Sequence, residues 1–349
     1  MTDNLNQKNK EIVWDFWQKM NYVGFDNIEK LVKTKMHKDI AWFGPQPINE
    51  LKGVDAVISG YWQPLYRSFP DLKRKCDIFL GSECCGECWV SACGYLTGTF
   101  AQDWLGIPAT GEKTNIHFGQ HYRVEDGMIV ENYLILDVLS VMRQAGFQVL
   151  PPARGAEGGK VLSPTTGDGV LLTAQDPLET LKTRQQVYAM LQGMMRFDGK
   201  NLRTMEMDKY WHPKMHWYGP TGIGSCHSLE EFEDFHQRPW LKAFPDRGMT
   251  TPPGKARSIG IENGEILAEG KYASLGIWDK VFSVNRGQYL DVPATGKLMT
   301  IRDFDWYRRE CDTLVQNWVP IDLIDIFMQL GINLFDRMFE QIEQRKSSR

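Results

Sequence analysis

The feature that most constrains this chain is an internal repeat that spans a whole domain. Trp42-Phe-Gly-Pro45 recurs as Trp217-Tyr-Gly-Pro220, at a spacing of 175 residues. Pro108-Ala-Thr-Gly111 recurs as Pro293-Ala-Thr-Gly296, at a spacing of 185 residues. Matches that keep their order at a domain-sized period indicate a duplicated domain and not a solenoid. The larger second spacing predicts an insertion, in a loop among the middle strands of the second copy.

The 349 residues therefore divide into two repeats and a connection. Residues 151–175 are rich in glycine and proline, which is typical of a linker. We expect a first domain at residues 1–150, a linker at 151–175 and a second domain at 176–349. Hydrophobic residues make up 42% of the chain, enough for two globular cores and too many for a disordered protein.

Each repeat begins with helical periodicity and continues with segments typical of strands. In the first repeat, apolar spacing predicts helices within residues 9–36 and over residues 54–69. Four strands are expected at about 72–80, 87–100, 114–124 and 128–136. Asp137 then opens a short final helix. This order predicts an α+β fold in which helices wrap a curved, mostly antiparallel sheet.

Composition excludes several classes of partner. The net charge is −4 and the body of the chain has no basic run, so we expect no nucleic-acid partner. No apolar run approaches the length of a membrane span, and the N-terminal residues do not resemble a signal peptide. Together with an odd number of cysteines, seven, this predicts a cytoplasmic protein. The Cys84-Cys-Gly-Glu-Cys88 run has one Cys-x-x-Cys pair and lacks a second, so no metal site is predicted there.

This layout resembles the SnoaL-like polyketide cyclase group of the nuclear transport factor 2-like superfamily. The matching residues of the first repeat are Phe69-Pro-Asp-Leu72, Gly106-Ile-Pro-Ala-Thr-Gly111, Arg123-Val-Glu-Asp-Gly-Met-Ile-Val130 and Asp137. Those of the second are Trp217-Tyr-Gly-Pro220, Phe244-Pro-Asp246, Val292-Pro-Ala-Thr-Gly296, Asp305-Trp-Tyr-Arg-Arg309 and Asn317-Trp-Val-Pro-Ile-Asp322.

The resemblance implies two fused cone-shaped domains, each with an apolar pocket open at one end. It further implies that an aspartate near the end of the last strand acts as acid and base on an enolisable substrate, without metal or organic cofactor. Asp137 and Asp322 match that position. An alternative role for each is a helix N-cap, because an apolar helical segment follows directly.

Alternation along the expected strand 114–124 places Gln120 and Tyr122 on the pocket side. Asp305 and Tyr307 occupy the same positions in the second repeat. His121 falls on the opposite side, where the two sheets are expected to meet, although a slip of one residue would move it into the pocket. The candidate substrate-binding residues are Tyr122, Tyr307, Trp42, Trp217 and His121.

The candidate catalytic residues are carboxylates and one amide. Asp305 with Asp322 would form a pair able to supply both an acid and a base. Asp137 has only the neutral Gln120 as its partner, so the two pockets should differ chemically. The alternative for Asp305 is a structural carboxylate with no role in chemistry.

These residues predict a cofactor-independent acid/base enzyme, of cyclase, lyase or isomerase type, acting on a hydrophobic small molecule by aldol-like proton abstraction. A non-catalytic small-molecule-binding or scaffold protein is one alternative. An epoxide or ester hydrolase using the same carboxylates is another. The two domains are expected to pack sheet to sheet as an intramolecular pseudo-dimer, and further oligomerisation stays open.

Overall fold

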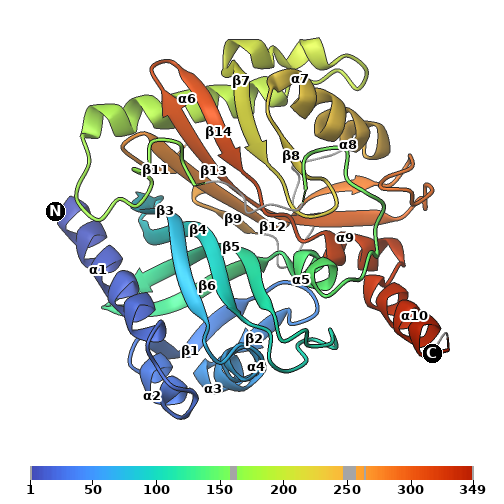
Figure 1. The fold of residues 1–349 in the computed structure, drawn as a ribbon. Helices are drawn as coiled ribbons and strands as arrows, with labels where there is room; N and C mark the ends of the chain where they lie inside the picture. The colour runs from blue at the N-terminus through green and yellow to red at the C-terminus, as the bar shows by residue number, and fades with distance from the viewer. Residues whose placement is uncertain (1, 158–162, 247–256, 263–264, 348–349) are drawn as a thin grey trace.

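The computed structural model describes residues 2–157, 163–246, 257–262 and 265–347 (Figure 1). We call residues 1–150 the first half and residues 176–349 the second half. The helices of the first half are α1 (Thr2–Met20), α2 (Ile28–Lys33), α3 (Val54–Val57), α4 (Gln63–Ser68) and α5 (Val138–Gln144). Two short turns accompany them, the 3-10 turn η1 (Phe25–Asn27) and the π-helical turn η2 (Ile58–Trp62).

The strands of the first half form one sheet. They are β1 (Met36–Phe43), β2 (Glu50–Lys52), β3 (Lys73–Cys84), β4 (Glu87–Thr99), β5 (Lys113–Glu125) and β6 (Met128–Leu136). Their order across the sheet is β2-β1-β6-β5-β4-β3. All neighbours are antiparallel except β1 and β6, so the predicted strands and their mostly antiparallel pairing are confirmed.

The second half has more elements. Its helices are α6 (Pro177–Met194), α7 (Leu229–Phe232), α8 (Arg238–Ala243), α9 (Leu323–Leu330) and α10 (Leu334–Ser347), with the 3-10 turns η3 (Leu202–Met205) and η4 (Met207–Lys209) and the π-helical turn η5 (Glu233–Gln237). Its strands are β7 (Trp211–Tyr218), β8 (Ser225–Cys226), β9 (Arg257–Ile259), β10 (Ile261–Glu262), β11 (Glu265–Glu269), β12 (Tyr272–Val284), β13 (Leu298–Glu310) and β14 (Thr313–Trp318). They run in the order β10-β11-β12-β13-β14-β7-β8, and β9 pairs with β12. Among the described helices, none is long and apolar enough to cross a bilayer.

The structure confirms the repeat at the level of strand register. Trp42 of β1 lies opposite Asn132 of the parallel strand β6. Trp217 of β7 lies opposite Asn317 of the parallel strand β14 in the same way. Even the irregular π-helical turns, η2 and η5, recur at the spacing of the repeat. The fold is therefore a duplicated α+β unit.

Part of the predicted insertion is a hairpin and not a loop. Ile78 and Leu80 are close neighbours on β3, and both pair with β4. Their counterparts on β9 and β11, Ile259 and Leu267, pair with the equivalent positions of β12. The hairpin of β10 and β11 occupies the chain between them. The rest of the insertion follows Asp246 and lies outside the described residues.

The two sheets contact each other through their outer faces (Figure 1). The apolar residues of this contact come from both halves and, at Leu171, from the linker: Ile78, Leu80, Cys84, Trp89, Cys93, Tyr133, Ile135, Leu171, Tyr218, Ile259, Leu267, Tyr272, Trp278, Phe304, Trp306 and Trp318. His121 stacks on Trp306 with ring centroids 5.1 Å apart. The hydroxyls of Ser91 and Ser274 are 2.8 Å apart, and His121 Nε2 lies 2.9 Å from the Ser274 hydroxyl. The side of β5 predicted to face the other sheet is thus the one that does.

The described residues of the linker are ordered against both halves. Phe79 of β3 donates its amide to Gly169 O at 2.9 Å and accepts the amide of Leu171 at 2.8 Å. Ala156 exchanges backbone hydrogen bonds with Ser225 of β8. Linker composition therefore coexists here with regular backbone pairing.

The contact between the sheets yields a test at Gly119 of β5. A Cβ at this position would lie 2.7 Å from Pro320 Cγ and 2.8 Å from the Trp306 ring. We expect Gly119→Ala to lower the free energy of unfolding by about 1–3 kcal/mol, because a packed interior must shift to admit the methyl group. Urea denaturation measures it.

Gly24→Ala is the matched control, because no atom lies within 4 Å of its Cβ position and its φ is −78°. This variant should stay within about 0.5 kcal/mol of wild type. Equal effects of the two substitutions would show that the sheets do not pack tightly at Gly119.

Candidate active site

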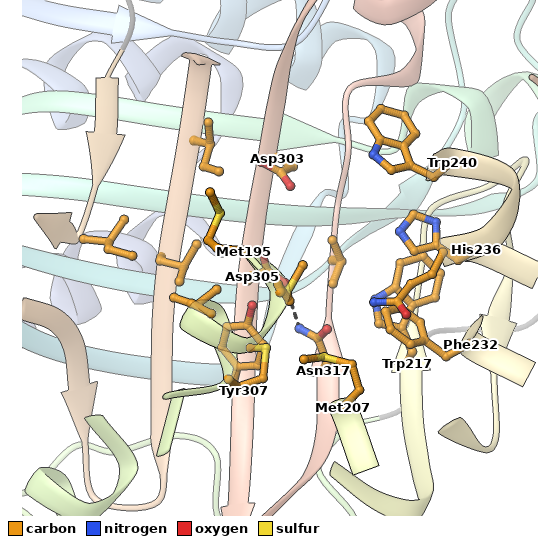
Figure 2. Close-up of a pocket in the computed structure, with 18 of the residues that line it drawn as sticks. Met195, Met207, Trp217, Phe232, His236, Trp240, Asp303, Asp305, Tyr307 and Asn317 are labelled. Carbon is orange, nitrogen blue, oxygen red and sulfur yellow. Dashed lines mark hydrogen bonds between the residues drawn. The ribbon is translucent and has the colours of Figure 1, made fainter. Parts of the chain in front are cut away.

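A cavity of about 270 Å³ lies in the second half, between the sheet and its covering helices (Figure 2). Asp303, Asp305 and Tyr307 reach it from β13, and Asn317 reaches it from β14. The remaining walls are mainly apolar, formed by Met190, Leu191, Met194, Met195, Met207, Trp211, Trp217, Phe232, Trp240, Leu241, Ile261, Leu275, Ile277, Ile301, Val319 and Ile321. A mostly apolar cavity with a few convergent polar groups is the usual form of a small-molecule site.

Asp305 is the central polar group of this cavity. Asn317 Nδ2 donates a hydrogen bond to Asp305 Oδ1 at 3.0 Å. The low-dielectric surroundings raise the pKa of Asp305 to about 6, although hydrogen bonds from Asn317 and Tyr307 pull it down. The residue is partly exposed and lines the cavity, so its carboxylate can be reached by a ligand.

The wall opposite Asp305 is aromatic and carries a histidine. His236 stacks on Trp217 with ring centroids 4.3 Å apart and an interplanar angle of 18°. Trp240 lies beyond it in the same stack, at 6.4 Å. Figure 2 shows His236, from the π-helical turn η5, across the cavity from the acidic side chains of β13. The sequence reasoning missed His236, Asp303 and the role of Asn317.

In the first half the same positions carry residues that fill the interior. Phe118 occupies the position of Asp303, and Tyr61 occupies that of His236. Tyr122 and Trp42 are fully buried in the aromatic core of this half. Within the described residues, the cavity between a sheet and its covering helices is therefore the one in the second half.

A cation also fills the first half. The Arg74 guanidinium lies 4.5 Å from the Trp17 ring centroid and 4.2 Å from that of Phe118. Arg74 Nη1 donates to Gln120 Oε1 at 3.0 Å, and Gln120 Nε2 donates to Asn132 Oδ1 at 2.7 Å. Gln120 is the counterpart of Asp305, but it donates to the equivalent asparagine where Asp305 accepts, and both ends of its side chain are engaged.

Asp137 does not enter the interior of the first half. Its Oδ1 accepts the amide of Ser140 at 2.9 Å, as a helix N-cap. Its Oδ2 accepts the backbone amide and the hydroxyl of Thr221 from the second half, at 3.0 and 2.8 Å. Burial raises the pKa of Asp137 in spite of these bonds. The residue lines a separate polar cavity of about 220 Å³ where the halves meet.

Asp322 repeats this arrangement. Its Oδ1 accepts the amide of Asp325 at 3.1 Å, and its Oδ2 accepts the amide of Gln46 from the first half at 2.8 Å. Burial and the nearby charge of Asp325 raise its pKa, while Arg302, whose Nη1 is 3.7 Å away, opposes the shift.

The predicted meeting of Asp305 and Asp322 in one cavity is therefore not what the structure shows. Ile321 lines the cavity and bridges to Asp303, but the next residue, Asp322, is not among the lining residues. Its carboxylate is committed to capping α9 and to the other half of the chain. The physical reason is the position of Asp322 at the start of α9. A carboxylate that caps this helix end cannot at the same time point into the cavity that Ile321 lines.

His121 likewise lines neither of the two cavities described above. It is fully buried between the sheets against Trp306 and Phe304, and burial lowers its pKa to about 3. The strand alternation predicted this face, so the slip of one residue that would have moved His121 inward does not occur. Tyr307, Trp217 and Asp305 are the predicted site residues that share one cavity.

Comparisons place the first half among known proteins. The model of the SnoaL-like polyketide cyclase family matches residues 12–145. No curated protein sequence matches the chain. A solved structure described as a proposed SnoaL-like polyketide cyclase, from Jannaschia sp. CCS1, is 19% identical with a TM-score of 0.35, covering 41% of this chain and 94% of its own.

Two further solved structures are similar over the same extent. TsrD from Streptomyces laurentii is 18% identical with a TM-score of 0.33, covering 39% of this chain and 96% of its own. A nuclear transport factor 2-like protein from Burkholderia thailandensis is 19% identical with a TM-score of 0.31, covering 40% of this chain and 98% of its own.

The raised pKa of Asp305 predicts a pH dependence of stability. Protonated Asp305 favours the folded state, and this contribution is complete below about pH 4 and lost as the pH rises through about 6. Relative to Asp305→Asn, the wild type should therefore lose about 1–2 kcal/mol of unfolding free energy between these limits, a value reduced for partial exposure. Urea titrations of both proteins across this range measure the difference, and parallel curves would contradict it.

Proposed function

We propose that the chain is a cofactor-independent acid/base enzyme of cyclase or isomerase type, in keeping with the match of residues 12–145 to the model of the SnoaL-like polyketide cyclase family. Its substrate is a hydrophobic small molecule that binds in the cavity of the second half. The observation that carries the proposal is Asp305, a carboxylate of raised pKa that faces an apolar cavity. The family match does not extend to this half, so the activity is argued from the site itself.

In the proposed reaction, Asp305 removes a proton from a carbon next to a carbonyl group. The electron pair of the C–H bond moves into a carbon–carbon double bond, and the carbonyl oxygen becomes an enolate oxygen. A pKa of about 6 leaves Asp305 ionised near neutral pH and still basic enough to accept the proton. Asn317 holds the carboxylate in place through its 3.0 Å hydrogen bond.

The enolate then has two outcomes that this site could support. Attack of its carbon on a second carbonyl of the same molecule closes a ring, and the new alkoxide takes up a proton. Return of the proton from Asp305 to a different carbon gives an isomer. His236, on the wall across from Asp305 (Figure 2), is placed to meet the oxygen of the substrate. Its stacking on Trp217 fixes the plane of the ring.

Two rival functions use the same cavity. A binding or scaffold protein would hold the ligand without turnover, and Asp305 would then be a structural acceptor for Asn317. An epoxide or ester hydrolase would use Asp305 to activate water. A second carboxylate, Asp303, lines the same cavity and is available to such a reaction. We favour proton abstraction from carbon, since the walls around Asp305 are mainly apolar.

We also propose the architecture and setting in which this enzyme works. The domains are residues 1–150 and 176–349, with 151–175 as the linker, and they form an intramolecular pseudo-dimer in the cytoplasm. The reciprocal contacts support the pseudo-dimer. Asp137 binds Thr221 and Asp322 binds Gln46, and these are equivalent positions of the two repeats.

Hydrogen–deuterium exchange at carbon tests the proposed chemistry. Aromatic 1,3-diketones would first be ranked by binding, and exchange at their acidic carbon in deuterated buffer followed by NMR. We expect the wild type to accelerate exchange, and Asp305→Asn to lose about 10²–10⁴-fold of the acceleration while still binding the ligand. The acceleration should rise with pH through about 6, as Asp305 ionises.

Two comparisons separate the rivals. Asp322→Asn removes a helix-capping carboxylate and not the proposed base. This variant, if folded, should therefore still accelerate exchange, whereas Asp305→Asn should not. Binding without accelerated exchange by wild type would support the binding protein. Incorporation of solvent ¹⁸O into an epoxide or ester product would support the hydrolase. Equal exchange by wild type and Asp305→Asn would overturn the proposal.

A further inference from the structure

The hairpin between β3 and β4 brings two adjacent thiols to the edge of the contact between the halves. Cys84 ends β3 and is buried, whereas Cys85 is exposed in the turn. Cys85 and Gly86 both have positive φ, 50° and 80°, as a two-residue hairpin turn with matched strand twist requires. The turn therefore fixes the direction in which each thiol points relative to the sheet.

A carboxylate from the second half meets these thiols. Glu265 is the first residue of β11 and belongs to the hairpin that the first half lacks. Its Oε2 accepts the backbone amide of Cys85 at 2.7 Å, and its carbonyl oxygen lies 3.8 Å from Cys84 Sγ. The hydrogen bond from Cys85 thus holds the side chain of Glu265 beside the two thiols.

The three side chains offer ligand atoms that converge. One sulfur each from Cys84 and Cys85 and a carboxylate oxygen of Glu265 all lie within 4.8 Å of one another. Ligands around tetrahedral zinc stand about 3.5–4 Å apart, given metal–sulfur distances near 2.3 Å and metal–oxygen distances near 2.0 Å. Small side-chain rotations would bring the three atoms to that spacing.

We infer that Cys84, Cys85 and Glu265 form a zinc site that ties the first half to the second. Two thiolates select a borderline-soft cation such as Zn²⁺ over Mg²⁺ or Ca²⁺. Water completes the tetrahedron, since Cys85 and Glu265 are exposed. The amide of Cys85 supplies the outer hydrogen bond that orients a metal-bound carboxylate.

Cys88 lies outside this site although it completes the Cys-x-x-Cys pattern. It pairs with Glu83 across the hairpin, whereas Cys84 pairs with Glu87, so the two cysteines alternate to opposite faces. The ligand pair is therefore the adjacent cysteines and not the spaced ones.

The metal would act at the junction of the halves and not in the reaction. β11 is held against β3 at its other end as well, where Glu269 accepts the amide of Gly81 at 2.9 Å and pairs with Lys10 at 2.5 Å. A bound ion at Glu265 would fasten the second end. Metal binding would then raise the stability of the whole chain and leave the proposed Asp305 chemistry in place.

Zinc titration of the fully reduced, metal-free chain tests the site. Calorimetry should show one Zn²⁺ bound per chain, with proton release that scales with the buffer as thiols ionise. Cys84→Ser, Cys85→Ser and Glu265→Gln should each weaken binding at least tenfold. Co²⁺ in place of Zn²⁺ should give a thiolate-to-metal charge-transfer band that Cys85→Ser reduces.

Matched controls make the result decisive. Cys311 is another exposed hairpin-turn cysteine with positive φ, 49°, so Cys311→Ser should leave binding unchanged. Cys88→Ser should also leave it unchanged. Zinc should raise the melting temperature of wild type and not that of Glu265→Gln, which removes an exposed charge and should fold. Absence of zinc binding by wild type, or loss through Cys88→Ser with Glu265→Gln unaffected, would overturn the inference.

Discussion

The closing aspartates determine how the two repeats are joined. Asp137 and Asp322 each cap the helix that follows and each accept a backbone amide from the opposite repeat, at Thr221 and Gln46. These bonds join the two halves, and a buried polar group that loses its hydrogen-bond partner lowers stability. Because both carboxylates are hydrogen-bonded at this junction, any reactive group inside either half must come from other side chains.

The interiors then differ through a few substitutions at equivalent positions. Phe118 and Gln120 stand where the second repeat has Asp303 and Asp305. The ring of Phe118 helps to hold the Arg74 guanidinium, which occupies the first interior together with Trp17. In the second repeat smaller acidic groups leave space that apolar residues surround. One backbone therefore supports a filled core and an open site, and side-chain volume decides which.

The repeat, the order of elements and the inward side of β5 and β13 could all be predicted, because matched motifs and strand alternation are local properties of the sequence. Asp305 and Tyr307 lie on the predicted inward side, where they line one cavity with Trp217. The direction of the Asp322 side chain could not be predicted. This residue stands between a strand and a helix, and its direction depends on a contact with Gln46 of the other repeat. His236 was missed because a π-helical turn breaks the helical period. Glu265 lies far along the chain from Cys84 and Cys85, and no spacing rule connects them.

Fusion of the repeats has a consequence that their contact alone would not have. In a symmetric dimer of identical subunits, every substitution appears twice, so a change that opens one interior opens both and doubles its cost in stability. A single chain escapes this coupling. Here the equivalent positions Tyr61 and His236 could change independently. The first interior could stay fully packed while the second lost packing contacts and opened a cavity. The duplicated unit thus acts as a permanent structural partner whose concentration never varies.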